Sequence, residues 1–177
     1  METITLQDGR TLTIRPPVPD DAEAMVAYVH VVDSQTPYLG RNPGEFALTP
    51  EQERALINGM GDARLWLLAL IDGQIVGMVD IGIMRNRQRM RHRAGLGISV
   101  LQDVWGLGVG SRLMERSISW CREKDLEQIE LEVVDGNERA IALYEKFGFQ
   151  RTGCLPRAMK YPNGSYADEV TMVLRLS

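Results

Sequence analysis

The chain has 177 residues, of which 44% are hydrophobic and 25% are charged, and its net charge is −4. This composition is typical of a globular protein, and we expect one domain over residues 1–177. The negative net charge argues against nucleic acid as a partner, and no apolar run is long enough to span a bilayer. The N-terminus lacks the basic and apolar regions of a signal peptide, which favours a cytoplasmic location.

The first part of the chain reads as two strand hairpins separated by two helices. Asp8-Gly9 and Asp72-Gly73 each lie between β-branched or apolar runs, a pattern typical of tight hairpins. Helix starts are predicted at Asp20 and Thr49, because a Glu or Gln three residues later completes a capping box at each. The strands expected in the hairpins cover residues 3–7, 11–15, 65–71 and 75–84.

A loop over residues 34–48 is unusually long for a connection within one domain. Its length indicates either a lid or binding loop, or a surface loop held by packed aromatic residues. The side chains that it offers for contact are Tyr38, Arg41, Glu45 and Phe46.

Residues 85–93 carry an arginine at every second position. On an extended hairpin these side chains would all lie on one side. The segment is therefore either a basic patch for an anionic substrate or cofactor phosphate, or a solvated hairpin tip.

Three alternating glycines, Gly106, Gly108 and Gly110, lie between an expected strand (96–101) and an expected helix (111–124). Such glycines leave backbone N–H groups uncovered, and the helix N-terminus adds a partial positive charge. We therefore expect a phosphate or pyrophosphate to bind here. A Rossmann fingerprint that begins at Gly106 would need a glycine at its sixth position, where this chain has Ser111. A P-loop would need a Gly-Lys-Ser/Thr sequence, which the chain lacks.

The rest of the chain alternates strands and helices. A strand is expected at 128–134, then a helix that opens at Asn137 and is closed by Gly148, and then strands at 149–155 and 169–176. The order of elements predicts an α/β protein, with a mixed sheet and helices on its faces. Cys121 and Cys154 lack metal-ligand spacing, and we expect no metal.

The glycine loop and the helix after the next strand together resemble the GNAT superfamily of acetyl-CoA-dependent N-acetyltransferases, in its small bacterial members. The family's loop reads Arg/Gln-x-x-Gly-x-Gly/Ala, and here Trp105 stands in the Arg/Gln position before Gly106. The second signature is matched by Asn137, Ala140, Leu143, Tyr144, Lys146, Gly148 and Phe149. The resemblance implies a mixed, mostly antiparallel central sheet with helices on both faces.

The resemblance also implies which residues bind acetyl-CoA. The backbone of the strand that precedes the glycine loop would hold the pantetheine arm, and the loop would wrap the pyrophosphate. The implied cofactor-binding residues are Ile98, Val100, Leu107, Gly108, Val109, Gly110, Ser111, Arg112, Asn137, Ala140, Tyr144 and Lys146.

The implied reaction is direct attack of a primary amine on the thioester. A strand N–H would support the oxyanion, and Tyr144 would act as the general acid on the departing thiolate. The general base stays open among Glu45, Glu132, Asp80 and a chain of waters, with Glu45 and Glu132 preferred.

The acceptor implied by the small bacterial members is a small-molecule amine or an amino acid, with neither nucleic acid nor membrane as a partner. Two alternatives remain: acetylation of a protein N-terminus or lysine, and a sensor module that binds acetyl-CoA without turnover. A homodimer is left open.

Overall fold

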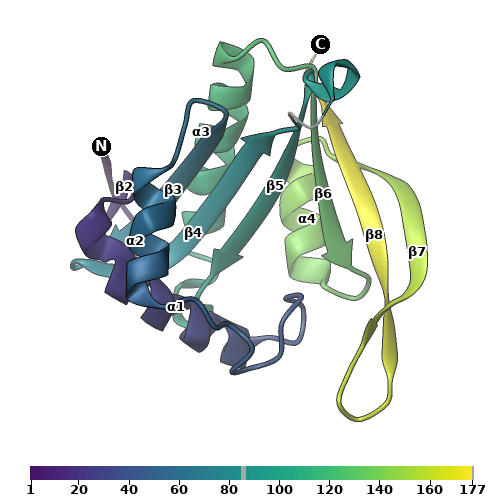
Figure 1. The fold of residues 1–177 in the computed structure, drawn as a ribbon, viewed down its shortest axis with the longest axis horizontal. Coiled ribbons are helices and arrows are strands. Elements are labelled where there is room, and N and C mark those ends of the chain that lie inside the picture. Colours follow the sequence, from purple (N-terminus) through teal and green to yellow (C-terminus); the bar gives the residue numbers. More distant parts are fainter. Residues whose placement is uncertain (85–86, 177) are drawn as a thin grey trace.

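A computed structural model describes residues 1–84 and 87–176, and the strands in this part of the chain form one eight-stranded sheet (Figure 1). The strand order is β1-β2-β3-β4-β5-β6-β8-β7. Only β5 and β6 pair in parallel; the other neighbours are antiparallel. The strands are β1 (Glu2–Thr5), β2 (Thr11–Arg15), β3 (Arg64–Ile71), β4 (Gln74–Ile83), β5 (Arg93–Val100), β6 (Gln128–Val134), β7 (Gln150–Lys160) and β8 (Tyr166–Arg175).

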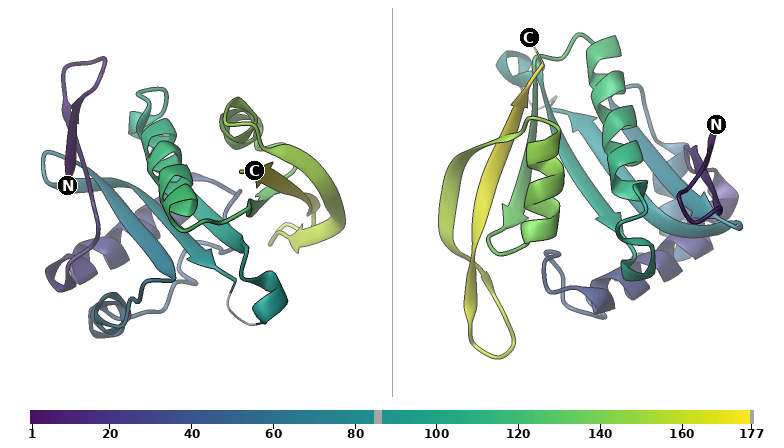
Figure 2. Two further views of the ribbon diagram at one scale, coloured as in Figure 1. Left: turned by 90° about the horizontal axis from the view of Figure 1, so that it is seen from above. Right: turned by 180° about the vertical axis from the view of Figure 1, so that it is seen from behind.

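Helices cover both faces of this sheet (Figures 1 and 2). The helices are α1 (Ala22–Gln35), α2 (Pro50–Asn58), α3 (Val109–Glu123) and α4 (Glu138–Lys146). One core lies beneath α1 and α2 and includes Met25 and Leu68, and the other lies beneath α3 and α4 and includes Leu113 and Ile81. The predicted mixed, mostly antiparallel α/β fold with helices on both faces is confirmed. Over residues 1–84 and 87–176, no helix has the length and apolar character needed to cross a membrane.

The two predicted helix starts differ in outcome. Thr49 and Gln52 form the predicted capping box of α2, because the Thr49 amide donates to Gln52 Oε1 (2.9 Å) and the Gln52 amide to Thr49 Oγ1 (3.3 Å). The box predicted at Asp20 is wrong: the N-cap of α1 is Asp21, and its side chain makes no cap hydrogen bond. The Asp21 carboxylate instead accepts two hydrogen bonds from Arg15, at 2.6 and 2.7 Å.

The arginine-rich segment does not have the predicted extended shape. Gln88–Met90 form a short 3₁₀ turn, which breaks the two-residue alternation. Arg93 lies within β5 and forms an ion pair with Glu130 on β6. The segment's other described arginines, Arg87, Arg89 and Arg91, are exposed; the first arginine of the run, at position 85, lies outside the described residues.

The C-terminal hairpin extends further than the sequence predicts. The ladder between β7 and β8 is interrupted after Leu155 and then resumes at Met159, so that both strands continue to the Lys160–Tyr166 pair. The interruption holds Pro156, which an edge strand tolerates, and Arg157, whose φ is 54°. The result is a hairpin that projects beyond the sheet (Figure 1).

Candidate active site

A cleft opens where β5 and β6 separate. The two strands pair only between Arg93–Gly95 and Gln128–Glu130, and beyond these residues they diverge (Figure 1). The cleft has a volume of about 800 Å³ and is bordered by α3 and α4. The predicted cofactor-binding residues that line it are Ile98, Val100, Gly108, Val109, Gly110, Ser111, Asn137, Ala140, Tyr144 and Lys146.

The free edge of β5 presents backbone polar groups to this cleft. The Leu101 amide donates to Val76 O, and Arg93 O accepts from the Met84 amide, so these two residues direct their backbone groups toward β4. Backbone direction alternates along a strand, and residues at even positions therefore face the other way. The N–H and C=O groups of Ile98 and Val100 consequently point into the cleft, as a strand-like ligand would require.

The N-terminus of α3 forms one end of the cleft. Gly108 is its N-cap, with a φ of 89°, and a Cβ built there would meet no atom within 4 Å. The amides of Leu107 and Arg112 are occupied, since they donate to Val104 O and Gly108 O. The amides from Gly108 to Ser111 therefore provide the anion site that a helix N-terminus offers.

Leu107 and Arg112 thus have a different position from the other predicted cofactor residues. Neither lines the cleft, and Leu107 packs against the core. The Arg112 side chain donates to Glu115 at 2.8 Å, on the surface of α3.

The opposite wall of the cleft is α4. The Asn137 side chain caps this helix by accepting a hydrogen bond from the Ala140 amide (3.3 Å), and Asn137 also borders the cleft. At the other end of α4, Lys146 Nζ donates to Ser111 Oγ across the cleft at 3.2 Å. A cation therefore lies next to the amide cradle.

Two further residues at the mouth of the cleft were missed from the sequence. Trp105 Nε1 donates to Val100 O at 2.8 Å, and the Arg139 guanidinium lies 4.6 Å from the centroid of the Trp105 ring. Both line the cleft. Arg139 occupies a variable position of the Asn-x-x-Ala signature, and the signature therefore does not predict it. The one sequence feature that could have indicated Arg139 is a cation in the first turn of a helix that faces a glycine loop.

Tyr144 lies on α4 and lines the same cleft, with 6% of its surface exposed. Its ring packs 5.9 Å from the Phe149 ring. Burial raises the pKa of the Tyr144 hydroxyl to about 12, and the group is therefore a proton carrier at neutral pH.

Two of the carboxylates considered as general bases already have partners. Glu45 is exposed and accepts hydrogen bonds from Asn42 Nδ2 and the Asn42 amide, which lower the pKa of Glu45. Asp80 accepts two hydrogen bonds of 2.6 Å from Arg64. Neither lines the cleft.

Within residues 1–84 and 87–176, no group of three His, Cys, Asp or Glu side chains could hold a metal ion.

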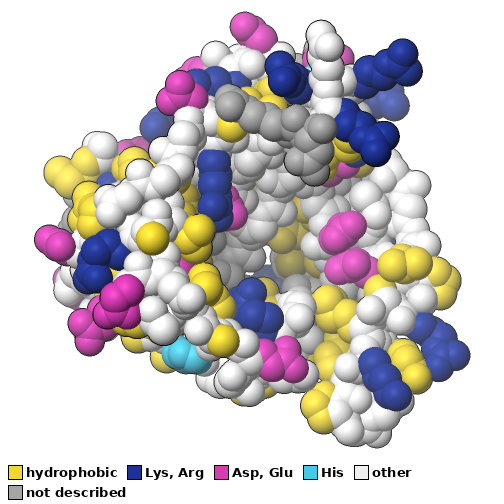
Figure 3. All heavy atoms as spheres, in the orientation of Figure 1, with side chains coloured by type: hydrophobic (Ala, Val, Ile, Leu, Met, Phe, Trp, Pro, Cys, Tyr) yellow, Lys and Arg dark blue, Asp and Glu magenta, His cyan; other side chains and the backbone are white. Residues whose placement is uncertain are grey.

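Glu132 lies on β6, on the sheet face opposite the α3–α4 core. In the ladder Glu132 opposes Thr171 and Val134 opposes Glu169, which places both glutamates on one face. Burial and the Glu132 carboxylate raise the pKa of Glu169. Figure 3 shows acidic side chains over β6 and β8, beside a central hollow. The sequence predicted no role in the site for Glu169, because its position next to Glu132 depends on the register between β6 and β8.

Comparison with known families agrees with this geometry. The family model for the acetyltransferase (GNAT) family matches residues 30–149. The chain belongs to the GNAT family. The match includes the separated strands, the amide cradle and the helix that carries Tyr144, and it confirms the predicted family.

Individual GNAT relatives share this fold or parts of the sequence. A GNAT-family acetyltransferase structure from Streptococcus pneumoniae has a TM-score of 0.87 and 31% identity, and the alignment covers 94% of this chain and 99% of that one. The L-amino acid N-acetyltransferase AaaT of Escherichia coli (strain K12) is 38% identical over 60% of this chain and 65% of its own length. A putative bS18-alanine N-acetyltransferase of Bacillus subtilis (strain 168) is 30% identical over 46% and 51%. The chain thus spans between about half and two thirds of these two curated relatives.

Proposed function

We propose that this protein transfers an acetyl group from acetyl-CoA to the primary amine of a small molecule, in particular an amino acid. The observation that carries this proposal is that three features border the same cleft: an anion cradle at α3, a free strand edge at β5 and the side chain of Tyr144. Membership of the GNAT family supports it, as does the similarity to an L-amino acid N-acetyltransferase.

The cleft's own groups fit a phosphorylated pantetheine thioester. The amides of residues 108–111 would bind the pyrophosphate, and Arg139 and Lys146 would add positive charge beside it. The N–H and C=O groups of Ile98 and the N–H group of Val100 would pair with the amides of the pantetheine arm, since Val100 O already accepts from Trp105 Nε1. When bound, acetyl-CoA supplies an acetyl group activated as a thioester.

Tyr144 is the proposed general acid. The amine nitrogen forms a bond to the acetyl carbon while the carbon–sulfur bond breaks. The departing sulfur takes the Tyr144 proton, the acylated nitrogen releases its surplus proton to solvent, and solvent restores the proton of Tyr144. The buried hydroxyl carries its proton at neutral pH, because its pKa is raised to about 12. A strand N–H would support the charge on the carbonyl oxygen.

The amine has to lose a proton before it attacks, because an amine with a pKa near ten is protonated at neutral pH. Of the two preferred bases, Glu132 is better supported than Glu45, because Glu132 is exposed on β6 and shares a sheet face with Glu169, whereas Glu45 is held within its loop by Asn42. Neither of the two lines the cleft. We propose a cytoplasmic location for this reaction.

A protein N-terminus is the second candidate acceptor. The similarity to a putative bS18-alanine N-acetyltransferase favours it, and its α-amine would undergo the same reaction. A sensor that binds acetyl-CoA without turnover is less well supported, since Tyr144 lines the cleft.

An assay of free-thiol release tests the proposal. Purified protein is incubated with acetyl-CoA and a panel of amino acids, polyamines and short peptides. We expect thiol release that depends on the amine and yields one acetylated amine per thiol. Tight binding of acetyl-CoA without thiol release for any amine would favour the sensor instead.

A further inference from the structure

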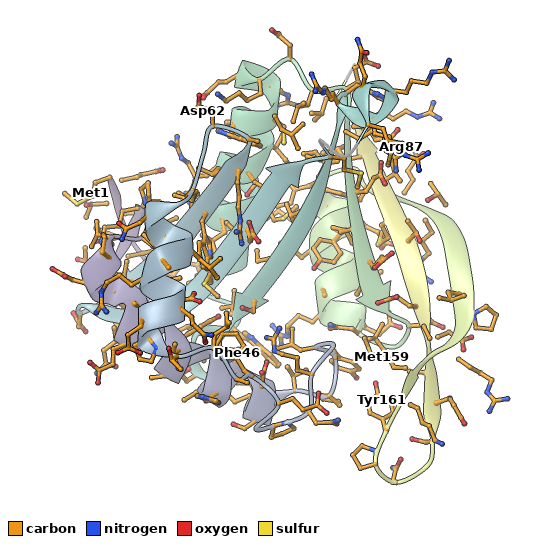
Figure 4. All side chains as sticks on the ribbon, viewed as in Figure 1. Met1, Phe46, Asp62, Arg87, Met159 and Tyr161 are labelled. Carbon is orange, nitrogen blue, oxygen red and sulfur yellow. The ribbon has the colours of Figure 1, made fainter. Side chains whose placement is uncertain are left out.

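A second cavity, of about 700 Å³, lies between the loop that follows α1 and the β7–β8 hairpin. The Tyr161 hydroxyl donates a hydrogen bond to Pro37 O (3.1 Å) and so joins these two walls, which are far apart in the sequence. Figure 4 shows Met159 and Tyr161 on the side of the hairpin that faces the loop. Thr36 and Leu39 line both this cavity and the cofactor cleft, and the two spaces are therefore neighbours.

The loop wall of this cavity holds a fixed arginine. Arg41 donates from Nε (2.8 Å) and from Nη2 (2.9 Å) to Asp33, whose side chain is fully buried. The guanidinium also lies 5.5 Å from the Phe46 ring centroid. These contacts fix its orientation, while 41% of the Arg41 side chain stays exposed. The Nη1 edge is left to bind a planar anion such as a carboxylate.

The opposite wall carries a carboxylate. Glu169 on β8 lines the same cavity, on the sheet face that it shares with Glu132. Two neighbouring carboxylates repel each other, and a cation between them relieves the repulsion. The ammonium group of an acceptor is such a cation. One cavity thus offers a fixed cation on one wall and an anion on the other.

We propose that this cavity is the acceptor site and that it selects free amino acids, with Arg41 binding the carboxylate and Glu169 binding the ammonium group. This inference rests on the proposed acetyl transfer, because the cavity adjoins the cleft in which the thioester would lie. In this arrangement Glu169, in place of its neighbour Glu132, takes one proton from the ammonium group. The neutral nitrogen then attacks the acetyl carbon and releases its surplus proton to solvent. The N-terminal residue of a peptide has an amide in place of the carboxylate and offers Arg41 no charge to bind.

The test compares an amino acid with its carboxamide. L-Alanine, L-alaninamide and a tripeptide that begins with alanine share the same amine and side chain, and L-leucine with L-leucinamide repeats the comparison. We expect kcat/KM to be about 10- to 100-fold higher for the free amino acid, the range expected for a charge-assisted pair. Equal rates for acid and amide, or a preference for the peptide, would overturn the inference while leaving acetyl transfer intact.

Variants of the arginine pair identify the residue responsible. Arg41→Gln alone would leave the buried Asp33 carboxylate uncompensated, and the main variant is therefore Arg41→Gln with Asp33→Asn. We expect it to lose the preference for the acid and to keep the affinity for acetyl-CoA. The matched control is Arg15→Gln with Asp21→Asn, a bidentate pair at the other end of α1 that lines neither cavity. A preference that survives in the Arg41 variant, or that disappears equally in the control, contradicts the role of Arg41.

The role of Glu169 has its own variant. Glu169→Gln should lower kcat/KM at least 10-fold for acid and amide alike, because both carry the ammonium group. The acetyl-CoA dissociation constant should not change, and Glu123→Gln at the end of α3 is the control. If no amine gives turnover, titration of L-alanine and L-alaninamide into the CoA-bound protein tests whether the cavity binds the acceptor. Binding of the acid that depends on Arg41 supports the acceptor site, and equal binding of both overturns it.

Discussion

At the scale of single residues, Tyr144 is the group on which the proposed chemistry depends. Its position on α4 places Tyr144 in the wall of the cleft, and burial raises the pKa of its hydroxyl to about 12. A hydroxyl that is both buried in the cofactor cleft and protonated has the two properties that a general acid requires.

Tyr144→Phe removes this proton and keeps the packing against Phe149. We expect kcat to fall by about 10²- to 10⁴-fold, the usual contribution of a general acid. Thiol release measures the rate, and a binding titration should give an unchanged affinity for acetyl-CoA. An unchanged kcat would assign the proton to another donor or to solvent.

The raised pKa of Tyr144 also predicts the alkaline side of the pH–rate profile. A general acid works only while protonated, and its activity is lost as pH rises through its pKa, which is about 12 here. We therefore expect no decline caused by Tyr144 between pH 7 and roughly pH 10, which is about two units below that pKa. A profile of kcat against pH checks this. A decline in this window that Tyr144→Phe abolishes would contradict the assignment.

Arg139 contacts Trp105, the residue that stands in the Arg/Gln position of the family's loop signature. Its guanidinium lies over the Trp105 ring at the mouth of the cleft. Arg139→Gln should weaken acetyl-CoA binding by about tenfold, because a cation near the phosphates is lost. Calorimetry measures the affinity, and Arg122→Gln on α3, outside the cleft, is the control. Equal affinities of the two variants for acetyl-CoA would show that Arg139 does not contribute to acetyl-CoA binding.

At the scale of elements, the position of α3 on the sheet decides where the amide cradle points. A Cβ at Gly77 on β4 would lie 3.2 Å from Leu113 Cδ1 and from Val109 Cγ1, both on α3. The missing side chain lets α3 approach the sheet closely. The cradle at residues 108–111 is thereby held over the gap between β5 and β6.

Gly77→Ala should consequently lower the free energy of unfolding, by about 1–3 kcal/mol, the range for an overpacked core. Urea denaturation measures the change. Gly97→Ala on β5 is the matched control, since a Cβ there meets no atom within 4 Å. Equal stability of the two variants would show that α3 can shift at no cost.

At the scale of the whole molecule, two parts of the sheet meet at one short parallel contact. Three residues of β5 pair with three of β6, and the Arg93–Glu130 ion pair lies at this contact. Beyond it, the two strands diverge, and the cleft lies between the two parts. A ligand that fills the cleft touches β5 and α3 on one side and α4 on the other.

Acetyl-CoA should therefore stabilise the folded protein as a whole. At a free concentration 100 times its dissociation constant, binding to the native state alone adds about 2.7 kcal/mol. For a chain of this size that corresponds to a rise in Tm of roughly 5–10 °C. A melting experiment with and without acetyl-CoA measures it, with pyrophosphate as the control for simple anion binding. No shift at saturating acetyl-CoA contradicts the proposed cofactor.

Most strands and helices could be predicted from the sequence because their signals are local. Asp72-Gly73 marks a hairpin by itself, and Thr49 and Gln52 cap a helix within four residues. The local signal at Asp20 failed because a 3₁₀ turn over Pro19–Asp21 precedes α1, whose N-cap is Asp21. Local signals failed again where a bulge let β7 continue past Pro156.

The sequence by itself determined the family, the amide cradle and the place of Tyr144, because these depend on spacing within one loop and one helix. Only the tertiary structure decided which groups surround the proposed acceptor site. Arg41 comes from the loop after α1, and Glu169 and Tyr161 come from the β7–β8 hairpin, and spacing along the chain cannot bring this loop and this hairpin together. Their meeting depends on the register of β6 with β8 and on the separation of β5 from β6, which are set by packing across the whole sheet.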